Sequence, residues 1–200
     1  NAVAVDKEII IVDDCSTDGT RRILQAIDLP GVRVFRHPEN RGKGAAIRTA
    51  IAAARGDAII IQDADLEYSP EEYPVLLAPI LSGDASVVYG VRDLSGQRLT
   101  TRWGNRFLTA LTNLLYGIRV HDMETCYKLV LTSIASRLDL ECNRFDLEPE
   151  ITAKIARMGH RIHEVPISYA PRAEKKLSPW RDGWPAVLAL LRYLRWKPAE

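Results

Sequence analysis

Two aspartates one residue apart, Asp63 and Asp65, are the strongest candidates for chemistry in this sequence. They follow an apolar run at residues 57–62 that is typical of a buried strand. Alternate side chains of an extended segment share a face, so the two carboxylates would repel each other unless a cation lay between them. Mg²⁺ or Mn²⁺ prefers such oxygen ligands and can bridge a diphosphate. An ordinary acidic turn is the alternative, because two acids at this spacing are common.

A second pair of acids, Asp13 and Asp14, stands at the end of another apolar run. Residues 8–13 are predicted to form a strand buried on both faces. A carboxylate at a strand end can accept hydrogen bonds from the base or ribose of a nucleotide. The alternative, a turn followed by a helix cap, suits residues 16–20 better than it suits the two aspartates.

The third candidate is the stretch Asn-Arg-Gly-Lys-Gly-Ala-Ala at residues 40–46, which contains Lys43. Two glycines and two cations at the start of a helix suit an anion. Ile47 stands where a dinucleotide fingerprint needs its third glycine, and the spacing of a P-loop is absent. Taken alone, an ordinary glycine-rich helix start explains the stretch equally well.

The elements that would position these residues alternate along the chain. Strands are predicted at residues 8–13, 32–35, 57–62, 85–89, 126–131 and 161–169, and helices at 20–27, 42–54, 70–81, 102–116 and 147–158. This alternation predicts a mainly parallel sheet with helices on both sides. Ligands of such sheets bind beyond the carboxyl ends of the strands, where both pairs of acids would lie.

Composition excludes several classes of protein. A chain of 200 residues with 46% hydrophobic content suffices for one α/β domain, and a net charge of +1 gives no bias toward nucleic acid. Cys15, Cys126 and Cys142 are odd in number and lack Cys-x-x-Cys spacing, which disfavours a disulfide framework or a zinc site. A reducing, cytoplasmic location fits, since we find no signal peptide and no membrane-spanning run.

Taken together, the motifs resemble family 2 glycosyltransferases of the GT-A fold. The resemblance rests on V-D-D-x-S-x-D-G-T at residues 12–20, N-x-G-K-G-A-A at 40–46 and G-D-x₅-D-A-D at 56–65. Segments 90–92, 122–128 and 164–167 are similar to the dolichyl-phosphate mannose synthase branch and its bacterial polyprenyl-phosphate relatives. The resemblance implies a GT-A (Rossmann-like) three-layer α/β/α fold with a mainly parallel sheet.

The resemblance also implies an activity. An inverting transferase of this branch moves a hexose, mannose or glucose, from a nucleotide-diphosphate sugar to a dolichyl or undecaprenyl phosphate. It implies a divalent cation, Mg²⁺ or Mn²⁺, on Asp63 and Asp65. The nucleotide sugar would contact Asp13, Asp14, Lys43, Asp63 and Ala64.

The same resemblance assigns an acceptor side. Asp122 matches a catalytic carboxylate of related enzymes, and its alternative is a cap or loop acid. Arg92, Arg102 and Arg106 fall where the branch keeps arginines near the acceptor phosphate, which guanidinium groups bind in a forked geometry. Arg102 and Arg106 share one helix face, so a solvated face is the alternative for them.

The end of the chain is basic and amphipathic. Residues 172–197 hold seven Lys or Arg against two acids. Val187, Leu190, Leu191 and Leu194 are predicted to form one helical stripe. We therefore expect a glycosyltransferase domain at residues 1–183 and an amphipathic helix at 184–200. That helix would either lie in the membrane interface, with the protein peripheral at the inner face, or pack on the domain.

The chain departs from the family at its start. Its first strand, at residues 8–13, matches the family's second, so the opening βα unit is expected to be absent and the fold N-terminally truncated. Two rival functions stay open. One is a family 2 transferase that acts on a saccharide or protein hydroxyl, and the other is an inactive fragment that binds nucleotide sugar.

Overall fold

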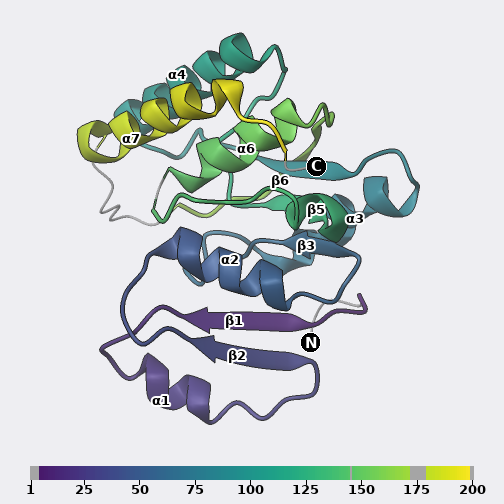
Figure 1. Ribbon diagram of the computed structural model, residues 1–200, viewed down its shortest axis with the longest axis vertical. Coiled ribbons are helices and arrows are strands. Elements are labelled where there is room, and N and C mark those ends of the chain that lie inside the picture. Colours follow the sequence, from purple (N-terminus) through teal and green to yellow (C-terminus); the bar gives the residue numbers. More distant parts are fainter. Residues whose placement is uncertain (1–4, 145, 172–178, 199–200) are drawn as a thin grey trace.

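The computed structural model describes residues 5–144, 146–171 and 179–198. Its strands are β1 (Ile9–Asp13), β2 (Val32–Arg36), β3 (Ala58–Ile60), β4 (Val87–Arg92), β5 (Lys128–Leu131) and β6 (His163–Ile167) (Figure 1). Its α-helices are α1 (Thr20–Gln25), α2 (Lys43–Ala53), α3 (Tyr73–Leu81), α4 (Leu99–Tyr116), α5 (Thr132–Ala135), α6 (Leu147–Arg157) and α7 (Pro179–Arg192). Two 3₁₀ helices, η1 (Pro70–Glu72) and η2 (Tyr193–Arg195), complete the described elements.

The strands form two sheets. β1 and β2 pair in parallel, and the second sheet has the order β3-β5-β4-β6. In that sheet β4 and β6 are parallel, whereas β5 runs antiparallel to both β3 and β4. β6 lies at an edge of this sheet, a position that suits its Pro166, because proline has no N–H to donate to a further strand. The antiparallel direction of β5 was not predicted.

Helices cover both faces of the larger sheet, which gives the three layers. Alternate residues of a strand point to opposite faces. Val87 therefore packs with Ile151 and Ile155 of α6, while Val88 packs with Leu76 of α3. The core of the domain thus lies on the two sides of β4 and β5.

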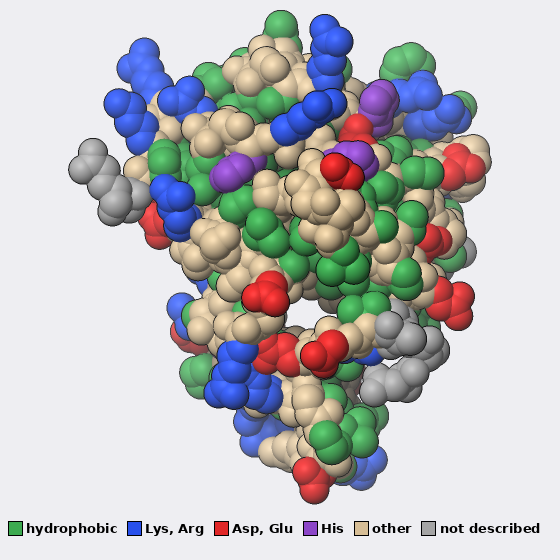
Figure 2. Space-filling view, turned by 90° about the vertical axis from the view of Figure 1, so that its right-hand side faces the viewer, with side chains coloured by type: hydrophobic (Ala, Val, Ile, Leu, Met, Phe, Trp, Pro, Cys, Tyr) green, Lys and Arg blue, Asp and Glu red, His purple; other side chains and the backbone are tan. Residues whose placement is uncertain are grey.

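No hydrogen-bonded strand joins the two sheets in the part of the chain that the structure describes. In Figure 1 the free edges of β1 and β3 face each other beside α2, and Figure 2 shows an opening between the lower and upper parts of the molecule. The predictions that residues 8–13 form a strand buried on both faces and that residues 57–62 form a buried strand are therefore wrong. Ile9 is 41% exposed, and β3 is only half-buried.

The last helix packs on the domain through one face. Ala186, Ala189, Leu190 and Tyr193 are buried, whereas Leu191, expected on the same stripe, is half exposed. The helix starts at Pro179, earlier than predicted, and contacts α4 and α6. None of the described helices combines the length and the apolar character that crossing a bilayer requires.

Candidate active site

Three stretches that the sequence singles out meet at one edge of the larger sheet. Asp63 follows β3, Arg92 ends β4, and Asp122 lies on the segment that leads into β5. Because β5 is antiparallel to β3 and β4, its amino end lies where those two strands end. The direction of one strand therefore brings residues 122–127 to the edge where ligands of α/β sheets bind.

Lys43 connects this edge to two helices. It begins α2, and its Nζ lies 2.9 Å from Asp63 Oδ2 and 2.8 Å from Oε1 of Glu148, in the first turn of α6. Burial acts to lower the pKa of Lys43, but the surrounding negative charges, Glu148 foremost, raise it well above its ordinary value. The ammonium group therefore stays charged. Sequence reasoning identified Lys43 but missed Glu148, 105 residues away.

Asp63 and Asp65 lie on a loop, because β3 ends at Ile60. The expected shared face of an extended strand is thus not observed: residues 64 and 65 form a turn, and Asp65 Oδ1 accepts a hydrogen bond from Glu67 N at 3.1 Å. Asp63 is 30% exposed and Ala64 is exposed. The loop thus leaves Asp63 and Ala64 within reach of a ligand from solvent.

The side chains available as metal ligands show whether a divalent cation fits at Asp63 and Asp65. Among the described residues no group of three His, Cys, Asp or Glu side chains could hold a metal ion. Two carboxylates suit an ion that takes its other ligands from a diphosphate and from water, as Mg²⁺ commonly does. Asp63 and Asp65 therefore fit a divalent cation that binds together with the diphosphate.

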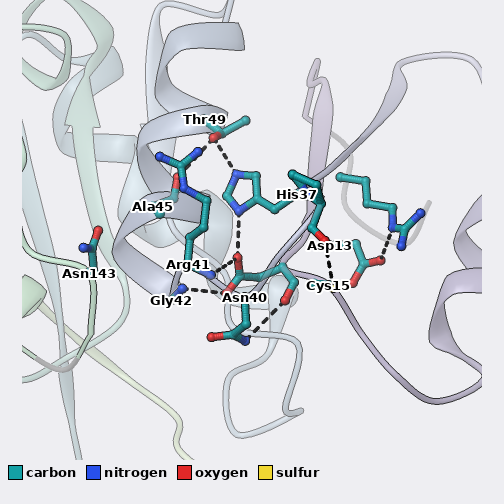
Figure 3. Close-up of polar contacts among 12 residues, drawn as sticks. Asp13, Cys15, His37, Asn40, Arg41, Gly42, Ala45, Thr49 and Asn143 are labelled. Atoms are coloured by element: carbon teal, nitrogen blue, oxygen red, sulfur yellow. Dashed lines mark hydrogen bonds and ion pairs between the residues drawn. The ribbon is translucent and has the colours of Figure 1, made fainter.

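The carboxylate of Asp14 lies at the start of α2, next to Arg41, Gly42 and His37, which Figure 3 labels. It accepts hydrogen bonds from Arg41 N at 2.9 Å and Gly42 N at 2.6 Å, and its Oδ1 lies 2.7 Å from His37 Nδ1. His37 is buried, and its Nε2 lies 2.9 Å from Thr49 Oγ1. Asp14 thus joins the end of β1 to the start of α2, the element that carries Lys43.

The glycines of the 40–46 stretch serve close packing. Gly42 has a φ of 91°, and a Cβ on Gly42 or Gly44 would overlap the backbone of Cys142 and Asn143. Gly44 N donates to Asn143 O at 2.9 Å. The backbone N–H groups of Arg41 and Gly42, just before α2, thus bind Asp14, and that of Gly44 in its first turn binds Asn143. The side chain of Lys43 is the remaining candidate for the predicted anion contact.

Asp14→Ala should lower the free energy of unfolding by about 2 kcal/mol at pH 7, because two backbone donors and His37 lose their acceptor. Burial acts to raise the pKa of Asp14, but hydrogen bonds from Arg41, His37 and Gly42 hold it below its ordinary value. A lowered folded-state pKa stabilises above the unfolded-state pKa and loses that effect as the pH falls through the folded value. Denaturant titrations should therefore show the difference from wild type shrinking below about pH 4.

Asp18→Ala is the control for this prediction. Asp18 lies in the same loop, but it is exposed, and its described hydrogen bond is a local one from Thr20 N at 2.9 Å. Its replacement should change stability much less. Equal losses for the two variants would contradict the role assigned to Asp14.

Asp13, the other predicted nucleotide contact, is buried and accepts from Ser16 N at 2.9 Å, with Arg36 Nε 3.7 Å away.

Arg92 and Asp122 form a buried, two-pronged ion pair. Nε and Nη2 of Arg92 lie 2.7 and 2.8 Å from the two oxygens of Asp122, and the side chains are 7% and 2% exposed. Burial acts to lower the pKa of Arg92, but Asp122 raises it above its ordinary value. The ring of Tyr169 lies 5.2 Å from the guanidinium. The predicted catalytic carboxylate and one predicted acceptor arginine are thus direct partners.

The other two predicted arginines lie farther along α4. Arg102 is half-buried and close enough to Asp93 that, after the hydrogen bonds from Ser95, its charge helps to lower the pKa of Asp93. Arg106 is exposed. None of the described contacts joins Arg102 or Arg106 to Arg92, so the structure does not gather the three arginines into one cluster.

Comparison with known proteins identifies the family. The profile described as Glycosyl transferase family 2 matches residues 3–138, which is more than half of the chain. The chain belongs to glycosyl transferase family 2. The match covers the strand ends that carry Asp13, Asp14, Asp63 and Asp65, together with Lys43 and Asp122.

Curated relatives of the chain include one hexosyltransferase and two transferases that are named for undecaprenyl phosphate. The chain is 32% identical to the low-salt glycan biosynthesis hexosyltransferase Agl6 of Haloferax volcanii, over 91% of this chain and 45% of Agl6. It is 28% identical to an undecaprenyl-phosphate mannosyltransferase of Micrococcus luteus, over 86% and 76%. It is 32% identical to an undecaprenyl-phosphate 4-deoxy-4-formamido-L-arabinose transferase of Pseudomonas paraeruginosa, over 87% and 52%. The chain thus spans about half the length of some relatives.

The solved structures confirm the GT-A fold. Glucosyl-3-phosphoglycerate synthase of Mycobacterium tuberculosis, in complex with Mn²⁺, UDP and glucosyl-3-phosphoglycerate, superimposes with a TM-score of 0.73. The superposition covers 94% of this chain and 68% of that protein, at 22% identity. At this identity the likeness concerns the fold alone.

Three tyrosines that sequence reasoning missed lie in the core beside the Arg92–Asp122 pair, and Tyr169 contacts Arg92 directly. The ring of Tyr68 lies 4.6 Å from that of Tyr127 in a tilted arrangement and 5.3 Å from that of Tyr169 in an edge-to-face arrangement, measured between centroids. The hydroxyl of Tyr169 donates to Glu67 Oε2 at 2.7 Å, and that of Tyr68 accepts from Cys126 N at 3.0 Å. These contacts join the loops after β3 and β6 to the segment before β5. Only Glu67 had a sequence signal, its place after the Asp63-x-Asp65 pair.

Proposed function

We propose that this chain is an inverting hexosyltransferase that moves mannose or glucose from a nucleotide-diphosphate sugar to a polyprenyl phosphate. The observation that carries the proposal is the convergence of Lys43, Asp63 and the Arg92–Asp122 pair at one edge of the larger sheet. The names of the relatives support a lipid-phosphate acceptor. Dolichyl and undecaprenyl phosphate share the headgroup that the site would bind.

The donor side would use Lys43, Asp63 and Asp65. A divalent cation, Mg²⁺ or Mn²⁺, bound by the two aspartates supplies charge neutralisation for the departing nucleoside diphosphate. The ammonium of Lys43 is already 2.9 Å from Asp63, so it lies beside the same group and adds a second positive charge. Asp13, Asp14 and Ala64 complete the proposed donor contacts, and Asp14 would act mainly by holding the start of α2.

The acceptor side favours a nucleophile that needs no base. Both oxygens of Asp122 already accept hydrogen bonds from Arg92, and the carboxylate is almost fully buried. A phosphate is largely ionised near neutral pH, so it can attack the anomeric carbon without losing a proton to the protein. We therefore propose that Asp122 acts by orienting Arg92, and that Arg92, Arg102 and Arg106 attract the acceptor phosphate.

A rival function is transfer to a saccharide or protein hydroxyl. Hydroxyl acceptors require a general base, and the engagement of Asp122 by Arg92 disfavours it in that role. The other rival is a fragment that binds nucleotide sugar without transferring it. The half-exposed edges of β1 and β3 favour this rival, because an open sheet edge lowers stability near the donor site.

A transfer assay separates these functions. Purified chain would be incubated with GDP-mannose or UDP-glucose and a short polyprenyl phosphate, with Mn²⁺, Mg²⁺ or a chelator. We expect one donor to give a lipid-linked sugar of inverted anomeric configuration, and the chelator to stop the reaction. Product with only a hydroxyl acceptor would favour the first rival. Calorimetric binding of donor without any transfer would favour the second, and no binding by the folded chain would overturn the proposal.

A further inference from the structure

The outward face of α4 is apolar. Leu99, Trp103, Phe107 and Leu114 are 70%, 67%, 61% and 81% exposed. Steps of four, four and seven residues keep these side chains on one side of a helix, opposite Leu108, which packs into the core. A helix on the surface of a water-soluble domain normally turns polar side chains outward. Packing within this domain therefore does not explain why these four apolar side chains lie on the outward face of α4.

The outward face of α7 has the same character. Trp184 is 65% exposed, and Leu188 and Leu191 are 49% exposed. These positions again follow helical spacing, while Ala186 and Leu190 on the other side are buried. Both helices thus use one apolar face to pack on the domain and present a second one to the outside.

The two stripes belong to one surface. α4 and α7 contact each other and lie side by side as the outermost helices at the top of Figure 1. We call the side chains Leu99, Trp103, Phe107, Leu114, Trp184, Leu188 and Leu191 the α4–α7 surface. Exposed apolar side chains gathered on two adjacent helices, with two tryptophans and a phenylalanine among them, indicate an interaction site rather than chance exposure.

The charge around the α4–α7 surface is mainly positive. Residues 98–119 contain four arginines and no acid, and residues 179–198 contain Arg181, Arg192, Arg195 and Lys197 against one acid, Asp182. Arg192 pairs with Glu141, whereas Arg106 and Arg195 are exposed. Figure 2 shows Lys and Arg side chains flanking hydrophobic ones at the upper end of the molecule. Such a pattern is complementary to anionic headgroups above an apolar layer.

We propose that the α4–α7 surface docks on an anionic lipid bilayer, with the two helices lying in the plane of the interface. Tryptophan and phenylalanine would enter the boundary between headgroups and acyl chains, and the flanking arginines would bind lipid phosphates. A second copy of the chain explains the apolar stripes less well, because it would bring two arginine-rich segments of net positive charge together.

The position of this surface deepens the proposed function, on which this step rests. α4 begins at Leu99, seven residues after Arg92, and Arg102 near its amino end lies close to Asp93. A bilayer seated on α4 and α7 would therefore present its headgroups beside the Arg92–Asp122 pair. A lipid phosphate could then reach the site without leaving the membrane.

Vesicle flotation without donor or acceptor tests the docking. We expect the wild-type chain to float with vesicles of phosphatidylcholine containing roughly one third phosphatidylglycerol, and to bind less to phosphatidylcholine alone or at high salt. Trp103→Ala/Phe107→Ala should lower the partition coefficient at least about tenfold, because two aromatic side chains no longer enter the interface. Both residues are exposed, so the thermal unfolding temperature should stay close to that of wild type.

Ile23→Ala/Leu29→Ala is the matched control. These side chains are 65% and 61% exposed and belong to α1 and the segment after it, at the opposite end of the molecule in Figure 1. The control should bind vesicles as wild type does. Unchanged flotation of Trp103→Ala/Phe107→Ala, or a dimer in sedimentation that this variant dissociates, would overturn the proposal. If the chain transfers sugar to a detergent-dispersed acceptor but does not bind vesicles, only the docking proposal is contradicted. If it binds vesicles but transfers no sugar, only the proposed enzyme function is contradicted.

Discussion

Asp63→Asn and Asp65→Asn should each lower the rate of sugar transfer by about 1000-fold, which corresponds to about 4 kcal/mol of lost transition-state stabilisation. An amide keeps the shape of the side chain but removes the charge that a divalent cation requires. The described structure offers no further carboxylate cluster to replace either aspartate. Mn²⁺ binding in the presence of a nucleoside diphosphate, followed by electron paramagnetic resonance, should weaken in parallel.

Stability separates this loss from misfolding. Asp63 is 30% exposed, and Lys43 keeps its contact with Glu148 when Asp63 becomes neutral, so thermal unfolding should change little. Asp57→Asn is the matched control, since Asp57 is an exposed acid just before the opposite end of β3. Full transfer activity in either variant, or equal losses in the control, would refute the cation site.

The local parts of the site could be predicted from the sequence. An apolar run that ends in acids gives both the strand and the position of its carboxylates, as at Asp63, because hydrophobic periodicity is a short-range signal. The glycine-rich helix start at residues 40–46 was located in the same way. The reason for the two glycines could not be predicted. Gly42 and Gly44 are required because the backbone of Cys142 and Asn143, far away in the sequence, packs closely against them.

The contacts that organise the site depend on topology, which periodicity does not carry. Glu148 pairs with Lys43 across 105 residues, and the sequence around either residue does not predict that the two meet. β5 has the composition of any buried strand, yet its antiparallel direction alone brings Asp122 to the end of β4. On α7 the sequence placed Leu191 on the packed stripe, whereas the buried face includes Ala186 and Ala189, whose small side chains allow close packing.

Arg92→Leu should destabilise the chain by about 3–5 kcal/mol, because it leaves the almost fully buried carboxylate of Asp122 without its partner. Denaturant unfolding would measure the loss. Arg33→Leu is the control. Arg33 on β2 forms a partly exposed ion pair with Glu8, and the loss of this pair should lower the free energy of unfolding much less. A similar cost for the two variants would mean that Arg92 and Asp122 are not a buried pair in solution.

The double variant Arg92→Leu/Asp122→Leu distinguishes a structural pair from a functional one. Replacing both members of a buried ion pair by apolar side chains is often neutral or stabilising, so the double variant should recover most of the stability that Arg92→Leu loses. If Asp122 orients Arg92 toward the acceptor phosphate, transfer should nevertheless stay at least about 100-fold below wild type. A double variant that is both stable and fully active would show that the pair only supports the fold, and the acceptor phosphate would then have to be bound by other residues.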